Sequence, residues 1–176
     1  MRFPKRGARH PYIPRKRLTV QSGVRGIRYG AAGMERRSRV FLDTSALLAG
    51  LNSPTGAAGV ILAACFSGSI VPIISLQVIE EAERNIVSKF PVLKDAWHSF
   101  MLIPPYVTKE PTMRQVRDAY ALLPTSDAPI LASAIAEKPD AMVTWNTRHF
   151  LRRKVVESVD FPILTPGAFL ERFFKP

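Results

Sequence analysis

The sequence predicts an α/β protein in three layers, α/β/α, with helices on both faces of a mostly parallel central sheet. From residue 39 onward, short apolar runs of strand length alternate with longer segments of helical periodicity. Serine, threonine, proline and glycine stand at the boundaries, as expected for helix caps and helix stops. Strands separated by helices need crossover connections, which join parallel strands. Together these observations favour a parallel sheet that is covered on both faces.

The first half of this region predicts two strands and three helices. The run Val40-Phe41-Leu42 is typical of a buried strand, and Ser53 followed by Pro54 is typical of a helix N-terminus. Gly68 marks a helix stop, and Ser75 a helix cap. The helix after Ser75 is expected to bury a face made of Leu76, Ile79, Ala82 and Ile86. The expected strands are 39–43 and 70–74, and the expected helices are 53–67, 75–89 and 90–102.

The second half continues the same alternation. Thr125 or Ser126 is expected to cap a helix in whose first turn Pro129 falls, where a missing N–H costs little. That helix is apolar nearly all round, which predicts a central position. The expected strands are 106–108, 141–145 and 161–164, and the expected helices are 112–123, 130–137, 147–153 and 167–174.

The net charge of +11 is concentrated at the N-terminus. Residues 1–33 carry nine lysines and arginines and no acid, which leaves 16 basic against 14 acidic residues, a charge of +2, for the rest. We therefore predict two regions, a disordered basic extension over residues 1–38 and a folded domain over 39–176. Because the folded domain is nearly neutral, charge gives little support for nucleic-acid binding there.

Three interpretations of the basic extension stay open. In the first, translation starts at Met34 and the extension is not part of the protein. In the second it is a basic arm that neutralises phosphates, and in the third it is an organelle transit peptide. The transit peptide is the weakest of these, because the extension contains a single serine, Ser22.

The sequence predicts a cytoplasmic protein with no membrane contact. No apolar run reaches the roughly 18 residues that a membrane span needs, and no apolar segment follows the N-terminal charges. The single cysteine, Cys65, excludes an internal disulfide and lies in an apolar run. We expect a buried structural thiol in a reducing compartment.

Polar side chains fall where the predicted strands end, which is where parallel sheets bind ligands. Asp43 ends the first strand and is followed by Thr44 and Ser45. Asn146 follows the strand expected at 141–145. We expect these side chains to meet in one crevice.

Two further acids are expected at the same edge. Glu80 lies one and a half turns into the helix after the second strand, with Glu81 and Glu83 nearby, and Asp127 opens a later helix. Oxygen ligands without cysteine or histidine pairs suit a hard cation such as Mg²⁺ or Mn²⁺. Clustered carboxylates repel one another unless a cation lies between them. Such a cation activates water and neutralises a phosphodiester, as a nuclease requires.

Each of these residues also has a purely structural interpretation. Asp43 is able to cap the helix that follows it, and Glu80 to pair with Arg84 one turn along. Asp127 favours a helix N-terminus through the helix dipole, and Asn146 suits a turn. Their combination at strand ends, in this order, favours the site over the separate structural roles.

Four segments of the chain resemble the PIN domain, and the resemblance covers about residues 39–175. They are Val40-Phe41-Leu42-Asp43-Thr44-Ser45-Ala46-Leu47-Leu48, Gln77-Val78-Ile79-Glu80-Glu81, Ser126-Asp127-Ala128-Pro129-Ile130-Leu131-Ala132-Ser133-Ala134 and Val143-Thr144-Trp145-Asn146-Thr147-Arg148-His149-Phe150. The resemblance implies a parallel sheet between helices and an endoribonuclease that depends on Mg²⁺ or Mn²⁺. Many bacterial and archaeal members are the toxin half of VapBC toxin–antitoxin pairs, which implies RNA as the substrate, a homodimer and a cognate antitoxin.

Carried over by position, the resemblance makes Asp43, Glu80 and Asp127 the metal-binding acids. Thr44 or Ser45 would support the metal site through a hydroxyl, and Asn146 would take the fourth polar position. The family often has aspartate there, so the neutral Asn146 casts doubt on a second tightly bound metal. His149 is expected to pack, to orient the Asn146 turn or to help hold phosphate.

Two other functions compete with the nuclease. The first is a PIN-like module that binds RNA or a protein without cleavage, for which Asn146 is the best support. The second is a phosphatase of the haloacid-dehalogenase type, which also begins with a strand that ends in aspartate. That chemistry needs a second acid two residues after the first, and here that position is Ser45.

Overall fold

The structure is a computed structural model, and it describes residues 36–174. These residues form a five-stranded sheet in the order β3-β2-β1-β4-β5, and every neighbouring pair of strands is parallel. The predicted α/β class with a parallel central sheet is therefore confirmed. The strands are β1 Ser38–Leu42, β2 Ile70–Ile74, β3 Tyr106–Val107, β4 Ala141–Val143 and β5 Ile163–Leu164.

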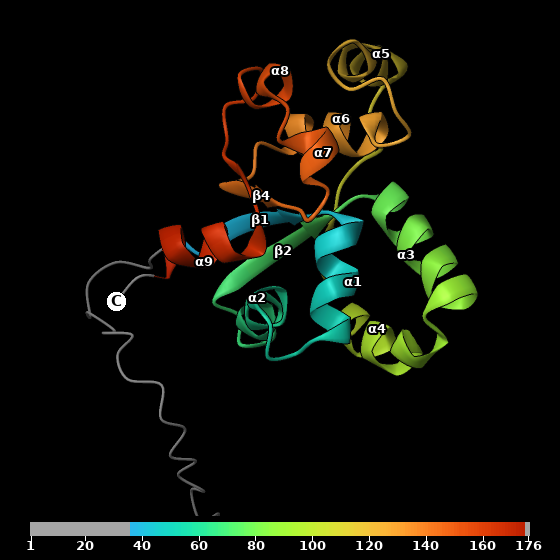
Figure 1. The fold of residues 1–176 in the computed structure, drawn as a ribbon, viewed down its shortest axis with the longest axis vertical. Helices are drawn as coiled ribbons and strands as arrows, with labels where there is room; N and C mark the ends of the chain where they lie inside the picture. The colour runs from blue at the N-terminus through green and yellow to red at the C-terminus, as the bar shows by residue number, and fades with distance from the viewer. Residues whose placement is uncertain (1–35, 175–176) are drawn as a thin grey trace, which may run out of the picture. The chain divides into compact units, whose positions relative to one another are not determined.

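Helices cover both faces of this sheet, as Figure 1 shows. The crossover connections place α1 to α4 on one face and α5 to α8 on the other, and α9 packs against α2. The helices are α1 Thr44–Asn52, α2 Ala57–Phe66, α3 Leu76–Lys89, α4 Lys94–Met101, α5 Met113–Leu122, α6 Ala128–Glu137, α7 Thr147–Phe150, α8 Arg153–Val156 and α9 Pro166–Phe173, with a 3₁₀ turn at Pro91–Leu93.

The core lies around β1, the middle strand. Val40, Phe41 and Leu42 are buried, as expected for a strand with neighbours on both sides and helices on both faces. The apolar helix α6 is also buried along most of its length, which confirms its predicted central position. Cys65 on α2 is buried, and burial raises the pKa of its thiol to about 12. The predicted structural thiol is confirmed.

The prediction of a helix over 53–67 was wrong at its start. α1 begins directly after Asp43, and Ser53 ends α1 instead of capping the next helix. The next helix, α2, has Gly56 as its N-cap. The turn between them is tight, because a Cβ atom on Gly59 would lie 2.3 Å from the carbonyl oxygen of Ser53. The predicted helix stop is confirmed, since Gly68 has a φ of +74° just after α2.

Other boundaries differ by smaller amounts. The helix expected at 90–102 begins with the 3₁₀ turn before α4, and the helix expected at 147–153 divides into α7 and α8, because Arg152 is extended. Ser75 caps α3 as predicted, and Thr112 caps α5. Asp127 occupies the N-cap position of α6 without a side-chain capping bond, and the hydroxyl of Thr125 accepts from the Asp127 N–H over 3.3 Å just before the helix.

No single helix within the described range is long and apolar enough to cross a membrane. By length and composition α1 and α2 together would pass such a test, but they are bent by 91° relative to each other. The predictions for the basic extension concern residues 1–35, which lie outside the described residues, apart from 36–38 at its boundary.

The direction of the chain connections changes between β1 and β4. The connection from β1 leads to one face of the sheet and the connection from β4 leads to the other, which is the arrangement that opens a ligand site at the carboxyl ends of the strands. The register pairs Leu42 with Val143, so that Asp43 and Thr144 leave the sheet side by side.

Candidate active site

Asp43 continues the hydrogen bonding of the sheet past the end of β1. Its backbone N–H donates to the Val143 carbonyl over 3.0 Å. Its side chain then starts α1, and Oδ2 accepts from the Ser45 N–H over 3.3 Å. The structural interpretation of Asp43 as a helix cap is therefore correct as far as it goes. The capping bond does not account for the side-chain contacts that the buried carboxylate also makes.

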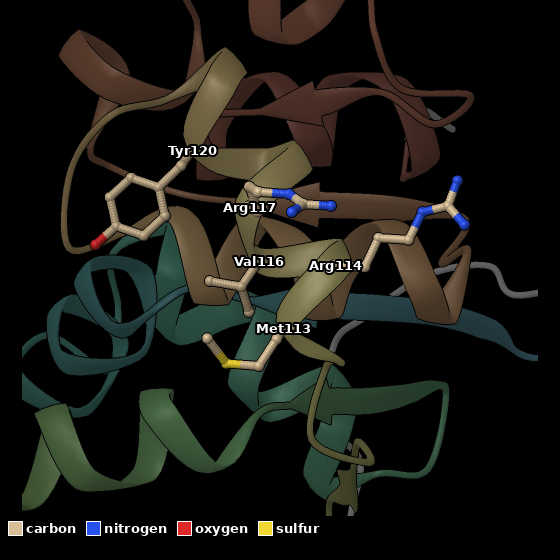
Figure 2. A pocket seen from close by; sticks show the side chains of 5 residues that line it. All are labelled: Met113, Arg114, Val116, Arg117 and Tyr120. Carbon is tan, nitrogen blue, oxygen red and sulfur yellow. The ribbon is translucent and has the colours of Figure 1, made fainter.

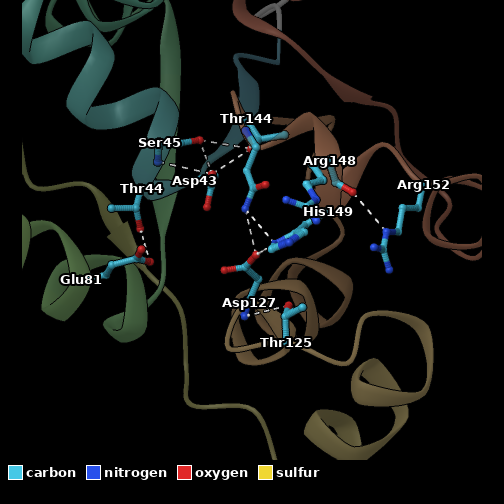
Figure 3. A network of polar contacts seen from close by, with 11 residues as sticks. Asp43, Thr44, Ser45, Glu81, Thr125, Asp127, Thr144, Arg148, His149 and Arg152 are labelled. Carbon is cyan, nitrogen blue, oxygen red and sulfur yellow. Dashed lines mark hydrogen bonds and ion pairs between the residues drawn. The ribbon is translucent and has the colours of Figure 1, made fainter.

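Two hydroxyl groups also donate to Asp43 Oδ2. Ser45 Oγ lies 2.5 Å away and Thr144 Oγ1 lies 2.8 Å away (Figure 3). Each hydroxyl has one proton, and both protons are used by Asp43. The 3.3 Å separation between the two hydroxyl oxygens is therefore a contact and not a further hydrogen bond.

The same two hydroxyls accept bonds from the turn after β4. The Trp145 N–H donates to Ser45 Oγ and the Asn146 N–H donates to Thr144 Oγ1, each over 2.9 Å. Each hydroxyl therefore links the turn that carries Asn146 to the Asp43 carboxylate, because it accepts from the turn and donates to Asp43. The sequence prediction of Ser45 as a supporting hydroxyl agrees with this geometry, and Thr144 has the same role from the neighbouring strand.

The pKa of the Asp43 carboxyl is raised above its ordinary value. Burial is the largest cause, because a low-dielectric surrounding disfavours the charged form, and the negative charge of Glu81 adds to it. The hydrogen bonds from Ser45 and Thr144 act in the opposite direction and do not compensate. Within residues 36–174 no basic side chain forms an ion pair with Asp43. A cation at this carboxylate would relieve the repulsion.

The acid that α3 presents to the crevice is Glu81. Thr44, which is buried, donates its hydroxyl to Glu81 Oε2 over 2.9 Å. Glu80, the residue expected from the sequence, is exposed and has no hydrogen-bond or ion-pair partner among the described residues. The structure thus brings Glu81, and not Glu80, next to Asp43. The hydroxyl of Thr44 thereby orients a carboxylate.

Asp127 forms the other half of the site with Asn146 and His149. Its Oδ2 accepts from the Asn146 amide Nδ2 over 2.8 Å, and His149 Nδ1 lies 2.6 Å from the same oxygen (Figure 3). Asn146 therefore connects the two halves, because its backbone reaches Thr144 and its side chain reaches Asp127. Of the six residues predicted, the structure brings five together, and His149 and Glu81 join them.

The donor set suits a hard cation with few protein ligands. Among the described residues, no three acidic, histidine or cysteine side chains lie close enough to hold one metal ion. Mg²⁺ usually keeps several water ligands and needs only one or two carboxylates. Asp43 and Glu81 provide two carboxylates, and the charge of Glu81 raises the pKa of Asp43, so the residues present fit Mg²⁺ or Mn²⁺ in a site with much water.

One hollow on the surface is separate from the carboxylates. It has a volume of about 560 Å³ on α5, where Met113, Val116 and Tyr120 lie beside two arginines, Arg114 and Arg117 (Figure 2). None of these residues bonds to Asp43, Glu81 or Asp127. The candidate site is therefore identified by its polar contacts and its place at the strand ends, and not by depth.

Comparisons with known proteins agree with the fold and identify the family. The model of a family described as the PIN domain matches residues 39–148. The fold is similar to the crystal structure of PAE2754 from Pyrobaculum aerophilum, with a TM-score of 0.53, 16% sequence identity and coverage of 77% of this chain and 95% of that chain. It is also similar to VapBC2 from Rickettsia felis bound to a DNA fragment from their promoter, with a TM-score of 0.51, 17% identity and coverage of 72% and 98%. At these identities the two structures support the fold alone. The comparison with curated protein sequences gave no match.

Proposed function

The chain belongs to the PIN-domain family, and from that premise we propose that it is a metal-dependent endoribonuclease and the toxin of a toxin–antitoxin pair. The observation that carries the proposal is the environment of Asp43. This carboxylate is buried at the end of the central strand, receives two hydroxyl donors and lies near a second acid with no cationic partner among the described residues. Such an arrangement is costly for folding and is typical of a functional site.

In this proposal Asp43 and Glu81 hold Mg²⁺ or Mn²⁺. When bound, the ion would supply an activated water and neutralise charge on the phosphodiester. Ser45 and Thr144 keep Asp43 in one orientation, and Thr44 does the same for Glu81. The protein's contribution is to fix two carboxylates in advance, so that little reorganisation is needed when RNA and metal bind.

The proposed partners follow from the family. We expect RNA as the substrate, a second copy of the chain in a homodimer and a cognate antitoxin that blocks the crevice. The Rickettsia felis structure, described as VapBC2 bound to promoter DNA, supports an antitoxin partner for a protein of this fold. We expect the protein to act in the cytoplasm, where its RNA substrates are. Co-purification with the product of the neighbouring reading frame tests the antitoxin, and the oligomeric state in solution tests the dimer.

The central test is RNA cleavage by the full chain and by Asp43→Asn. The wild type is expected to cleave RNA with Mg²⁺ or Mn²⁺ and not with EDTA, leaving 5′-phosphate and 3′-hydroxyl ends. Asp43→Asn is expected to be inactive with an unchanged circular dichroism spectrum, because asparagine still presents one oxygen to Ser45 and Thr144. Equal metal-dependent cleavage by the two proteins, purified in parallel, would exclude Asp43 from the chemistry.

A binding module without catalysis is the second candidate. The observation that favours it is Asn146, whose amide donates to Asp127 and so supplies no fourth negative charge. Calorimetric titration with Mn²⁺ separates the candidates. Binding that is lost in Asp43→Asn supports the nuclease, and no binding at millimolar Mn²⁺ supports the module.

A further inference from the structure

Trp145 is a large aromatic residue at the edge of the sheet where the candidate active site lies. It stands two residues past the end of β4, and the Thr144 N–H between them continues the sheet by donating to the Leu164 carbonyl over 3.0 Å. On the other side, the Asp43 N–H donates to the Val143 carbonyl. The backbone of the sheet therefore places Trp145 near the buried acid, independently of the side-chain contacts of the site.

The Trp145 side chain is exposed to an unusual extent. Its exposed fraction is 49%, whereas the other tryptophan of the chain, Trp97, is 4% exposed. Tryptophan is highly buried on average in folded proteins. No aromatic ring or cation of the described residues stacks on the Trp145 ring. The fold therefore keeps a large ring surface in contact with solvent beside the site.

Two exposed arginines follow Trp145 on the same segment. Neither Arg148 on α7 nor Arg152 just past it forms an ion pair with an acid among residues 36–174. Arg152 Nε donates to the Arg148 carbonyl over 3.1 Å, which holds the second guanidinium against the end of α7 (Figure 3). Guanidinium groups of this kind bind phosphate through two parallel hydrogen bonds.

The next two basic residues differ, because both have structural partners. Arg153 pairs with Glu157 over 2.6 Å, and Lys154 Nζ donates to the Ala121 carbonyl at the end of α5 over 2.7 Å. The basic residues of this segment are therefore of two kinds. Those without an acidic partner are the ones nearer in sequence to Trp145 and to the candidate site.

We propose that Trp145 stacks on a base of single-stranded RNA next to the bond that is cleaved, and that Arg148 and Arg152 bind the adjacent phosphates. This inference rests on the nuclease proposed above and adds the form of RNA that it takes. Every base has a flat face, so an exposed ring binds a single strand without reading its sequence. In an RNA duplex the bases stack on one another and do not present these faces.

The charges beside the ring favour RNA over a protein as the occupant. An apolar protein surface placed on Trp145 would remove the two neighbouring guanidinium groups from water without providing them with an anion, which is costly. An RNA strand provides both a flat base and phosphates at once. One ring and two cations thus explain how a domain with a charge of only +2 holds a polyanion.

The first experiment follows tryptophan fluorescence of the full-length protein as a short single-stranded oligoadenylate is added in EDTA. Stacking on Trp145 is expected to quench its emission, while the buried Trp97 keeps its own. Trp145→Phe is expected to lose the quenching and to bind within about 3-fold of the wild type, because a phenyl ring also stacks. Trp145→Leu is expected to bind about 10-fold more weakly. An RNA duplex of the same length is expected to cause no quenching.

Phe66→Leu is the matched control for the ring. Phe66 is exposed to a similar extent, 51%, but it ends α2 just before β2 begins and therefore lies at the opposite edge of the sheet. Its replacement is expected to leave RNA affinity and quenching unchanged. The circular dichroism spectra of all these variants are expected to match that of the wild type, since both side chains are about half exposed.

The second experiment measures how the same binding depends on salt. Each lost phosphate contact is expected to lower the slope of log affinity against log salt concentration by about 0.7 for a single strand. Arg148→Gln and Arg152→Gln are each expected to show this decrease. Arg153→Gln is the control and is expected to keep the wild-type slope, because Arg153 already pairs with Glu157. The basic extension is present in every variant, so it affects all of the slopes equally.

Three outcomes would overturn the inference. Wild-type affinity in Trp145→Leu would remove the ring from the RNA surface, and a wild-type slope in both Arg148→Gln and Arg152→Gln would remove the cations. A Trp145 emission that changes with protein concentration and not with RNA would assign the ring to a protein interface.

Cleavage assays separate this inference from the proposed function. If the wild type binds RNA as expected and cleaves none, the nuclease fails and the RNA surface remains. If the wild type cleaves RNA and Trp145→Leu binds and cleaves equally well, the role of Trp145 fails and the nuclease remains.

Discussion

The hydroxyl of Thr144 at the end of β4 donates to Asp43 at the end of β1 over 2.8 Å, and both side chains are buried. The bond links the two strands at their carboxyl ends. The connection that follows β1 leads to one face of the sheet, and the connection that follows β4 leads to the other. It also holds a carboxylate whose pKa is raised by burial and by Glu81.

Asp43 is expected to make the protein less stable as pH rises. Its pKa is higher in the folded than in the unfolded chain, so between the two values the folded chain binds more protons. Stability from this group is therefore complete below the unfolded value of about 3.8 and is lost as pH increases through the raised folded value. In EDTA, Asp43→Asn is expected to have a higher Tm than the wild type at neutral pH and a flatter Tm between pH 4 and 8. A lower Tm for Asp43→Asn at pH 7 would contradict this.

Glu81 and Glu80 provide a matched pair of variants for the proposed metal site. Mn²⁺ that binds only the folded protein is expected to raise the Tm, in proportion to the logarithm of its concentration. This increase is expected to be smaller in Glu81→Gln and unchanged in Glu80→Gln, because Glu81 contacts Thr44 and Glu80 is exposed. Thermal scans with and without Mn²⁺ make the comparison. If Glu80→Gln loses the increase and Glu81→Gln keeps it, the assignment is reversed.

Thr144→Val is expected to destabilise the protein by about 1–3 kcal/mol, because the buried Asp43 loses a donor and the Asn146 N–H loses its acceptor. Valine has nearly the same shape, so the change measures hydrogen bonding. RNA cleavage is also expected to fall, since Asp43 is no longer fixed. Thr147→Val is the control, as Thr147 is exposed and its hydroxyl has no described partner. Urea unfolding of both variants gives the difference, and equal stability would show that the Thr144 bond has little weight.

The contrast between Glu81 and Glu80 shows what the sequence was able to predict. The strand that ends in Asp43, the cap at Ser75 and the helix behind it were all predicted correctly, because they depend on short apolar runs and local caps. The choice of acid depends on the rotational phase of α3. The buried residues are Val78, Ala82 and Ile86, and Leu76 is exposed.

The buried face predicted for α3 differs from the observed face by a rotation about the helix axis. With about 100° per residue, the observed face puts Glu81 about 100° from its centre and Glu80 about 160° away. The face predicted from Leu76, Ile79, Ala82 and Ile86 has a different centre. Glu80 lies about 110° from that centre and Glu81 about 150° from it, so Glu80 is the closer acid. A rotation of about 50° therefore decides which acid reaches the site. Val78 and Leu76 are both apolar, so only tertiary packing selects between these phases, and the sequence does not contain a local signal for it.

The turn between α1 and α2 is tight, and the sequence pattern did not predict it. A Cβ atom on Gly59 would lie 2.3 Å from the Ser53 carbonyl oxygen and 2.4 Å from that of Pro54, and both are backbone atoms with little freedom to move. Gly59→Ala is therefore expected to lower the free energy of unfolding by about 1–3 kcal/mol or more. Gly167 on α9 has no atom within 4 Å of the same position, so Gly167→Ala is expected to be neutral or to stabilise by up to about 1 kcal/mol. Urea unfolding of the two variants compares the same chemical change at a crowded and an open site. Because α1 carries Thr44 and Ser45, a displaced turn is also expected to reduce Mn²⁺ binding in Gly59→Ala, and equal stability of the two variants would contradict the packing described here.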